Sequence, residues 1–162
     1  MDTPPNRASG LRFYLQETRL SCAPACLRMV MAYWGIEVDE ATLRDCCKTD
    51  WLGTAAENAV ACARRYGLWA EEVREASWDD LRRWLTDGLY PILLLNLFPL
   101  DALWVFHAVV VETVTDELVT YLDPVQGPRT VEVVAFQQAW RMNRRRAIVV
   151  APPDKSFVHR DG

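Results

Sequence analysis

The first half of this sequence is dominated by helical patterns and the second half by strand patterns. In the segment 23–34, apolar residues recur at the spacing of one helix face. From Tyr90 onward, apolar and valine-rich runs are short and are separated by turn residues. Because helices and strands are segregated rather than alternating, the sequence predicts an α+β fold.

Local signals define the expected elements. Pro24 suits the first turn of a helix over 23–34, and Gly35 suits the position just past its end. Thr54 and Glu57 have the spacing of a capping box at the start of another helix. We expect helices at 23–34, after Asp39, at 54–66 and at 77–86, strands at 90–97, 106–114, 118–122, 130–134 and 147–150, and a short helix at 136–141.

The 162 residues are sufficient for one domain with its own apolar core. Residues 1–10 are rich in Pro, Asn, Ser and Gly, and we expect them to form a flexible N-terminal arm. Residues 11–151 are the predicted folded domain. Residues 152–162 begin with two prolines and are expected to form a polar C-terminal tail.

The net charge of −4 gives no general attraction to nucleic acid or to anionic membranes. The one basic cluster, Arg141 with Arg144, Arg145 and Arg146, is typical of a solvated helix end or turn, and nucleic-acid binding is the weaker alternative. No apolar stretch reaches the ~18–20 residues of a membrane helix, and the N-terminus lacks the layout of a signal peptide. We therefore expect a cytoplasmic protein without a transmembrane segment, of unassigned oligomeric state.

The five cysteines favour reduced thiols, because an odd count without a secretory signal argues against a disulfide framework. Cys46, Cys47 and Cys62 are interpreted as small buried apolar residues. Cys22 differs from these, because it stands where the first predicted helix begins. A helix N-terminus carries unpaired N–H groups and partial positive charge, which favour a thiolate. Cys22 is therefore the candidate nucleophile, whereas Cys26, one turn further along, is interpreted as core.

Of the two histidines, His107 is the candidate general base, because His159 lies in the polar tail where geometry is poorly held. A lone histidine in an apolar strand is often structural, but a buried imidazole needs a partner. If 106–114 pairs with 118–122 as a hairpin, Asp123 comes beside His107 at its open end. We expect Asp123 to bind Nδ1 of the ring and to leave Nε2 facing the nucleophile.

Two further observations concern the same candidate site. Gln16 has an amide that can donate to an oxyanion together with the Cys22 backbone N–H, although a glutamine in an extended segment is usually only polar surface. Asp123 precedes Pro124, which is also typical of a turn.

The segment 16–35, Gln-Glu-Thr-Arg-Leu-Ser-Cys-Ala-Pro-Ala-Cys-Leu-Arg-Met-Val-Met-Ala-Tyr-Trp-Gly, resembles the catalytic motif of the bacteriocin-processing, double-glycine leader peptidases. These are papain-like cysteine peptidases, best known as N-terminal domains of peptide-exporting ABC transporters. In that family a glutamine precedes the catalytic cysteine by six positions, as Gln16 precedes Cys22. The segment 107–111 is similar to the family's histidine strand, and 123–127 is similar to its Asp-Pro-x-x-Gly segment.

The resemblance covers about residues 12–151. It implies a papain-like fold over 11–151, in which a helical half and an antiparallel sheet half flank the active-site cleft. It implies a cysteine-type peptidase, a hydrolase that cleaves a peptide or protein substrate through a thioester at Cys22. His107 and Asp123 complete the catalytic set, and Gln16 belongs to the oxyanion hole. No metal or organic cofactor is required for this chemistry.

Two departures from the family pattern limit what carries over. Ser21 and Ala23 stand where the family usually has an acidic residue and a glycine, so double-glycine specificity is an open question. No transporter domain follows by Gly162, so an export-linked role is not expected. A deamidase or acyltransferase at the same site and a non-catalytic peptide-binding module remain alternatives. A zinc site at Cys22 and Cys26 is a weak one, because no second ligand pair has recognised spacing.

Overall fold

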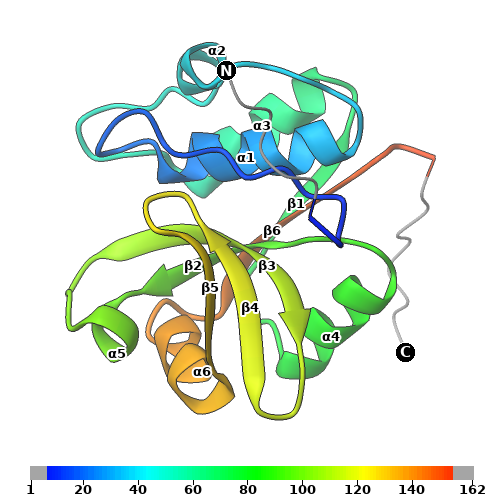
Figure 1. Ribbon diagram of the computed structural model, residues 1–162. Coiled ribbons are helices and arrows are strands. Elements are labelled where there is room, and N and C mark those ends of the chain that lie inside the picture. The colour runs from blue at the N-terminus through cyan, green and yellow to red at the C-terminus, as the bar shows by residue number, and fades with distance from the viewer. Residues whose placement is uncertain (1–6, 155–162) are drawn as a thin grey trace.

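The protein forms three layers, with a six-stranded sheet between two groups of helices (Figure 1). A computed structural model describes residues 7–154. Helices α1, α2 and α3 cover one face of the sheet, and α4, α5 and α6 lie on the other side. In chain order the elements are α1 (Cys22–Tyr33), α2 (Glu40–Cys46), α3 (Ala56–Arg65), β1 (Trp69–Val73), α4 (Trp78–Thr86), β2 (Ile92–Asn96), α5 (Phe98–Asp101), β3 (Phe106–Val114), β4 (Leu118–Asp123), β5 (Gly127–Glu132), α6 (Val133–Arg141) and β6 (Arg146–Ala151).

Helix α1 is the centre of the first layer. Its residues from Ala23 to Leu27 and from Met29 to Met31 are buried, so the helix is enclosed on most sides rather than on one stripe. It ends at Trp34, and Gly35 follows with a φ of 84°, a left-handed conformation that glycine adopts without steric cost. The helix predicted over 23–34 is thus confirmed to within one residue at each end.

The sheet is antiparallel throughout, with the strand order β1-β6-β2-β3-β4-β5. Strands β3 and β4 form the predicted hairpin, in which Val110 pairs with Leu122 and Val111 with Tyr121. A register shift between Val111 and Thr113 marks a β-bulge toward the turn end. At the open end of the hairpin, His107 and Asp123 lie close together at the same end of the strands, near the start of α1.

Two expectations about the elements were wrong, and two elements were not predicted. Thr54 does not cap α3, because its hydroxyl bonds that of Thr49 at 2.7 Å, and α3 begins after Ala55 without a side-chain cap. The strand expected at 130–134 ends at Glu132, because the following valines begin α6. Strand β1 and helix α5 were not predicted; among the described strands, β1 pairs with β6, far along the chain.

The cysteine prediction also needs a correction. Cys46 and Cys62 form a disulfide that joins the end of α2 to α3, with their Cα atoms 5.5 Å apart. Both helices pack on the same apolar cluster, and this packing brings two cysteines within bonding distance. Three free cysteines remain, Cys22, Cys26 and Cys47.

The described part of the N-terminal arm is anchored to the sheet. Arg7 makes a bidentate ion pair with Glu112, at 2.7 and 2.6 Å, and the Ser9 hydroxyl donates to the same carboxylate at 2.6 Å. Residues 1–6 and 155–162, which include most of the predicted arm and tail and His159, lie outside the described residues.

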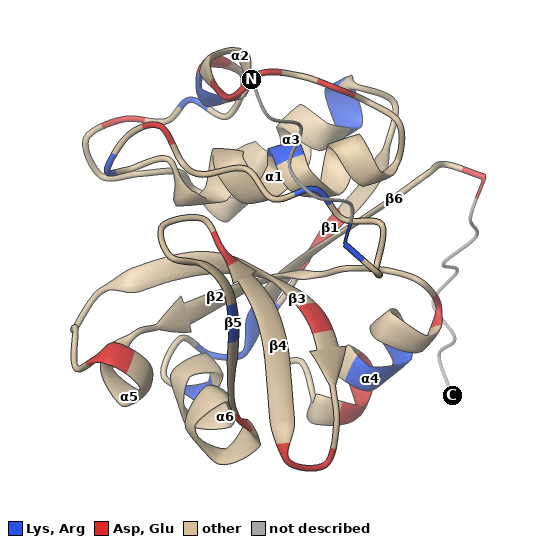
Figure 2. Cartoon of the chain, viewed as in Figure 1, with Lys and Arg blue, Asp and Glu red and all other residues tan. Residues whose placement is uncertain are grey.

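The arginine cluster at the α6–β6 turn has acidic partners. Arg144 and Arg145 pair with Glu75, and Arg146 pairs with Glu72 at 2.9 Å. Figure 2 shows blue and red positions interspersed over both halves of the molecule. Within residues 7–154, no helix has the length and apolar character needed to cross a membrane.

Candidate active site

Cys22 is the first residue of α1, and its side chain is half-buried. The His107 ring and the backbone N–H groups of Ala108 and Ala23 interact with its sulfur and lower the pKa of the thiol. Ala108 lies in β3, so the sulfur bridges the helical layer and the sheet. The helix start predicted for Cys22 is confirmed, whereas the cleft that its sulfur is expected to face stays a prediction.

His107 lies at the beginning of β3, opposite Leu95 of β2. Its Nε2 is 2.8 Å from Oδ1 of Asp123, and its side chain is 9% exposed. Since Nε2 is used by Asp123, the nitrogen left for the hydrogen bond with Cys22 is Nδ1. The predicted contact between His107 and Asp123 is confirmed, but the predicted orientation of the ring was the reverse, because strand pairing places Asp123 on the Nε2 side.

Asp123 ends β4 and is almost fully buried at 1% exposure. Its Oδ1 accepts from His107 and from the backbone N–H groups of Val125 at 2.8 Å and Gln126 at 3.3 Å. Asp123 therefore both binds the imidazole and closes the turn before β5, so the two interpretations of this residue hold together. These bonds fix the carboxylate independently of any ligand.

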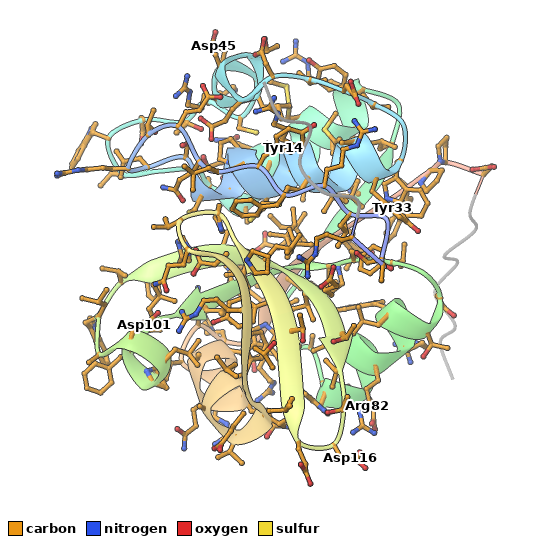
Figure 3. The ribbon with its side chains drawn as sticks, viewed as in Figure 1. Tyr14, Tyr33, Asp45, Arg82, Asp101 and Asp116 are labelled. Carbon is orange, nitrogen blue, oxygen red and sulfur yellow. A yellow bond between two sulfur atoms is a disulfide. The ribbon has the colours of Figure 1, made fainter. Side chains whose placement is uncertain are left out.

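Arg129 of β5 connects Asp123 to α5. Its guanidinium makes two hydrogen bonds to Asp101, at 2.9 and 3.0 Å, and lies 3.9 Å from Oδ2 of Asp123. Figure 3 shows Asp101 on α5, on the sheet side of the molecule. Oδ2 of Asp123 is buried and has no hydrogen-bond partner among the described residues, which is energetically costly. The nearby positive charge of Arg129 offsets part of this cost. Nothing in the sequence around Arg129 indicated this contact.

The three side chains alter one another's ionisation. Burial raises the pKa of the Cys22 thiol, but the hydrogen bond and positive charge of His107 outweigh it and bring the pKa below its usual value. Burial lowers the pKa of His107, but the hydrogen bonds to Asp123 and Cys22 raise it to about 9. Both shifts favour a thiolate beside an imidazolium over a neutral thiol beside a neutral ring.

Asp123 is the ionised carboxylate that contacts the His107 ring. Burial alone raises the pKa of its carboxyl, but the hydrogen bond and charge of His107 and the two backbone N–H groups lower it below the usual value. Its negative charge then stabilises the protonated ring at neutral pH.

The remaining free cysteines differ from Cys22 in environment. Cys26 is fully buried one turn below it, and burial raises the pKa of its thiol well above the usual value. Burial raises the pKa of Cys47 to about 11. Within residues 7–154, neither thiol has an imidazole partner, and the pKa shifts of both oppose formation of a thiolate.

Gln16 lies in the segment that leads into α1. Its backbone N–H donates to the Pro124 carbonyl at 2.8 Å, which places Gln16 against the turn that follows Asp123. Its side-chain Nε2 donates to the Thr18 carbonyl at 2.7 Å, and its Oε1 is buried without a hydrogen-bond partner among the described residues. The amide nitrogen has a second N–H, which the bond to Thr18 does not use.

Large apolar side chains are exposed on both sides of these residues. In the sheet half, the segment before His107 exposes Phe98, Leu103, Trp104, Val105 and Phe106. In the helical half, Leu15 and Leu20 are exposed beside Gln16, and Trp51 and Leu52 form the tip of a nearby loop. Monomeric proteins rarely expose such groups together without an interaction to make. No group of three or more potential metal ligands occurs within residues 7–154.

Solved structures share this fold. A double glycine motif protease from an AMS/PCAT transporter, determined in complex with the leader peptide, superposes with a TM-score of 0.73 at 22% identity, covering 89% of this chain and 93% of that chain. A C39-like peptidase from Bacillus anthracis gives a TM-score of 0.76 at 19% identity, covering 89% and 96%. The peptidase domain of Streptococcus ComA, a bi-functional ABC transporter involved in quorum sensing, gives 0.67 at 23% identity, covering 86% and 96%.

The fold, an antiparallel sheet with helices on both faces, is therefore one that this chain shares with solved peptidase structures. The sequence model of the Peptidase C39 family matches residues 11–155. This chain belongs to the Peptidase C39 family, a family of cysteine-type hydrolases. Among curated proteins, no sequence match is found.

Proposed function

We propose that Cys22, His107 and Asp123 are the catalytic residues of this peptidase and that Gln16 contributes to its oxyanion hole. The observation that carries the proposal is the hydrogen-bonded series from the Cys22 sulfur through the His107 ring to Asp123. It joins a nucleophile at a helix N-terminus to a base that is itself oriented by a buried carboxylate.

The chemistry follows from this order of groups. The Cys22 thiolate attacks the peptide carbonyl carbon, and the carbonyl π electrons move to oxygen. The backbone N–H of Cys22 and the amide of Gln16 donate to that oxyanion. As the C–N bond breaks, the imidazolium of His107 gives its Nδ1 proton to the leaving amine. Water then attacks the thioester, the ring takes up one water proton, and an acid product and the thiolate are released.

The substrate class we propose is a peptide segment that places apolar residues on the exposed side chains flanking the site. Phe106 immediately precedes His107, Trp104 lies three positions before it, and Leu20 lies two positions before Cys22 at the start of α1. One structural neighbour was determined with a leader peptide bound. Ala23 stands beside the sulfur, so a small residue next to the cleaved bond is favoured, and both Gly-Gly and Gly-Ala are candidate sites.

We propose the cytoplasm as the place of action, and the redox state of the Cys46–Cys62 disulfide in cells provides the test of this location. In that compartment the Cys46–Cys62 disulfide meets reducing thiols, and Cys46 is only half-buried. Trapping the cysteines of cells with an alkylating reagent and mapping the two residues tests this location. A fully oxidised pair in the native host would argue for an oxidising compartment.

The experiment for the catalytic proposal is hydrolysis of an internally quenched peptide library with Gly-Gly and Gly-Ala sites. Wild type should release fluorescence, and Cys22→Ala should release none above background. Cys47→Ala is the matched control, because it removes a free thiol outside the site, and it should retain turnover. The acyl-enzyme at Cys22 should be detected by mass spectrometry after rapid acid quenching. Turnover by Cys22→Ala, or an acyl group on another cysteine, would contradict the assignment.

A further inference from the structure

The segment 16–21 has no helix or strand, but it contains Gln16 and leads directly into Cys22 at the start of α1. The Thr18 backbone N–H donates to the Ser21 hydroxyl at 3.0 Å, and that hydroxyl donates back to the Thr18 carbonyl at 3.1 Å. Tyr14, which precedes the segment, lies along α1, and the Arg28 guanidinium is 3.9 Å from its ring centre (Figure 3). Glu17, the residue next to Gln16, has ion pairs from its side chain to Arg28 at 3.6 Å and Arg44 at 3.9 Å, and its backbone N–H is held by a further group.

That group is Glu40, from the first turn of α2. Its side chain is fully buried at 0% exposure, and its Oε1 accepts the backbone N–H of Glu17 at 3.0 Å. Its Oε2 lies 3.3 Å from Nη1 of Arg44, an ion pair without hydrogen-bond geometry. A charged acceptor on a backbone N–H makes one of the stronger hydrogen bonds in proteins.

Glu40 is not needed to begin α2. The cap of this helix is Asp39, whose side chain accepts the Thr42 backbone N–H at 2.7 Å. The buried carboxylate next to it instead accepts, through Oε1, the N–H of the chain position that follows Gln16, while its Oε2 faces Arg44 of the same helix. A buried charge is costly unless it is paired and hydrogen-bonded. The hydrogen bond from the Glu17 N–H offsets part of this cost for Glu40.

We propose that Glu40 is a positioning residue of the oxyanion hole. Glu40 accepts the Glu17 N–H, and the Pro124 carbonyl accepts the Gln16 N–H. Together these two hydrogen bonds fix the backbone on both sides of the Gln16 Cα, from which the side-chain amide extends. The Gln16 amide is itself held by the Thr18 carbonyl, which accepts from its Nε2 at 2.7 Å. This role of Glu40 rests on the proposed role of Gln16 as an oxyanion donor.

Two conservative variants separate this role from a structural ion pair with Arg44. Glu40→Gln keeps the length and the amide oxygen that accepts the Glu17 N–H but removes the charge. Glu40→Asp keeps the charge but shortens the side chain, so the carboxylate no longer reaches that N–H. We expect Glu40→Gln to retain most of kcat and Glu40→Asp to lose about tenfold or more with little change in KM. The reverse order, with Asp better than Gln, would assign Glu40 to the ion pair and overturn the proposal.

A second readout isolates the oxyanion hole from the nucleophile. An acetyl-Gly-glycinal aldehyde adds to the Cys22 sulfur and places an oxygen in the oxyanion hole, whereas iodoacetamide alkylates the same sulfur without forming an oxyanion. Glu40→Asp should weaken inhibition by the aldehyde and leave the alkylation rate of Cys22 unchanged. Equal loss of both would show a general distortion of the site and overturn the positioning role. Glu57→Asp, in the first turn of α3 and exposed, is the matched control and should change neither.

The coupling between Glu40 and Gln16 completes the test. Gln16→Ala should lower kcat, and Glu40→Asp should then cost less than about twofold more in the Gln16→Ala background, since the group it positions is gone. Additive losses would overturn the proposal while leaving the role of Gln16 intact. Wild-type turnover by Gln16→Ala would instead refute the role of Gln16 itself, and with it the role of Glu40, without affecting the test of Cys22.

Discussion

The helical half and the sheet half each supply two residues to the candidate site, but they hold them differently. In the helical half, Gln16 and Cys22 lie six positions apart in the sequence, and side chains such as Glu40 and Ser21 hold the segment between them. In the sheet half, His107 and Asp123 are sixteen positions apart and are brought together by the backbone pairing of β3 with β4.

The difference teaches where the site is most sensitive. A strand ladder is maintained by many backbone hydrogen bonds that side-chain substitutions leave in place. An irregular segment has few such bonds, so single side-chain changes can displace it. Replacements in the sheet half should therefore act on chemistry alone, whereas changes in the helical half should act on chemistry and on local order.

The largest expected effect is that of His107→Ala, which removes the base from a ladder that stays intact. We expect kcat/KM for a cleaved peptide to fall about 10³-fold or more, with the unfolding midpoint near that of wild type. Because the two residues act as a unit, the double variant of Cys22→Ala with His107→Ala should be scarcely less active than Cys22→Ala alone. His159→Ala is the control histidine and should keep full activity. Unaltered activity of His107→Ala would place the base elsewhere.

The next effect concerns the disulfide, which belongs only to the helical half. The closed loop spans a separation of 16 residues. A loop of this size predicts that replacing both Cys46 and Cys62 by alanine lowers the free energy of unfolding by about 3 kcal/mol. Hydrogen exchange should accelerate in α2 and α3 and stay unchanged in β3 and β4. Equal acceleration in both halves would show that the two are not independently ordered.

The smallest effect expected is that of Asp123→Asn, which keeps an acceptor for the His107 ring but removes the charge. A hydrogen bond to a charged group contributes about 1.5–3 kcal/mol, so we expect kcat/KM to fall about ten- to a hundredfold. The wild-type pKa of His107 is raised to about 9, so activity should decline as pH rises through that value, where the imidazolium loses its proton.

The pH profile of Asp123→Asn provides a sharper readout than the rate. Without the carboxylate, the pKa of His107 falls, and the alkaline decline of kcat/KM should move to lower pH. An unchanged alkaline limb would indicate that Asp123 does not stabilise the protonated ring. Glu112→Gln, in the same strand as His107 but paired with Arg7, is a control for loss of a buried carboxylate elsewhere and should not shift that limb.

The sequence by itself determined the features that depend on near neighbours along the chain. Pro24, the periodic apolar residues and Gly35 place Cys22 at a helix start, because helix termini depend on a few adjacent residues. The contact of His107 with Asp123 was also predictable, because residues equally distant from the short turn of a hairpin lie near one another on its two strands. The motif resemblance then agreed with the family to which the chain belongs.

The tertiary structure alone decided the features that depend on distant parts of the chain. The pairing of β1 with β6, the Cys46–Cys62 disulfide and the contact of Glu40 with the Glu17 N–H join segments that no local pattern connects. The ring nitrogen that faces Asp123 depends on how β3 and β4 are placed beneath α1. The physical reason is that local propensities act over a few residues, whereas side-chain partners and ring orientation follow from packing of the whole core.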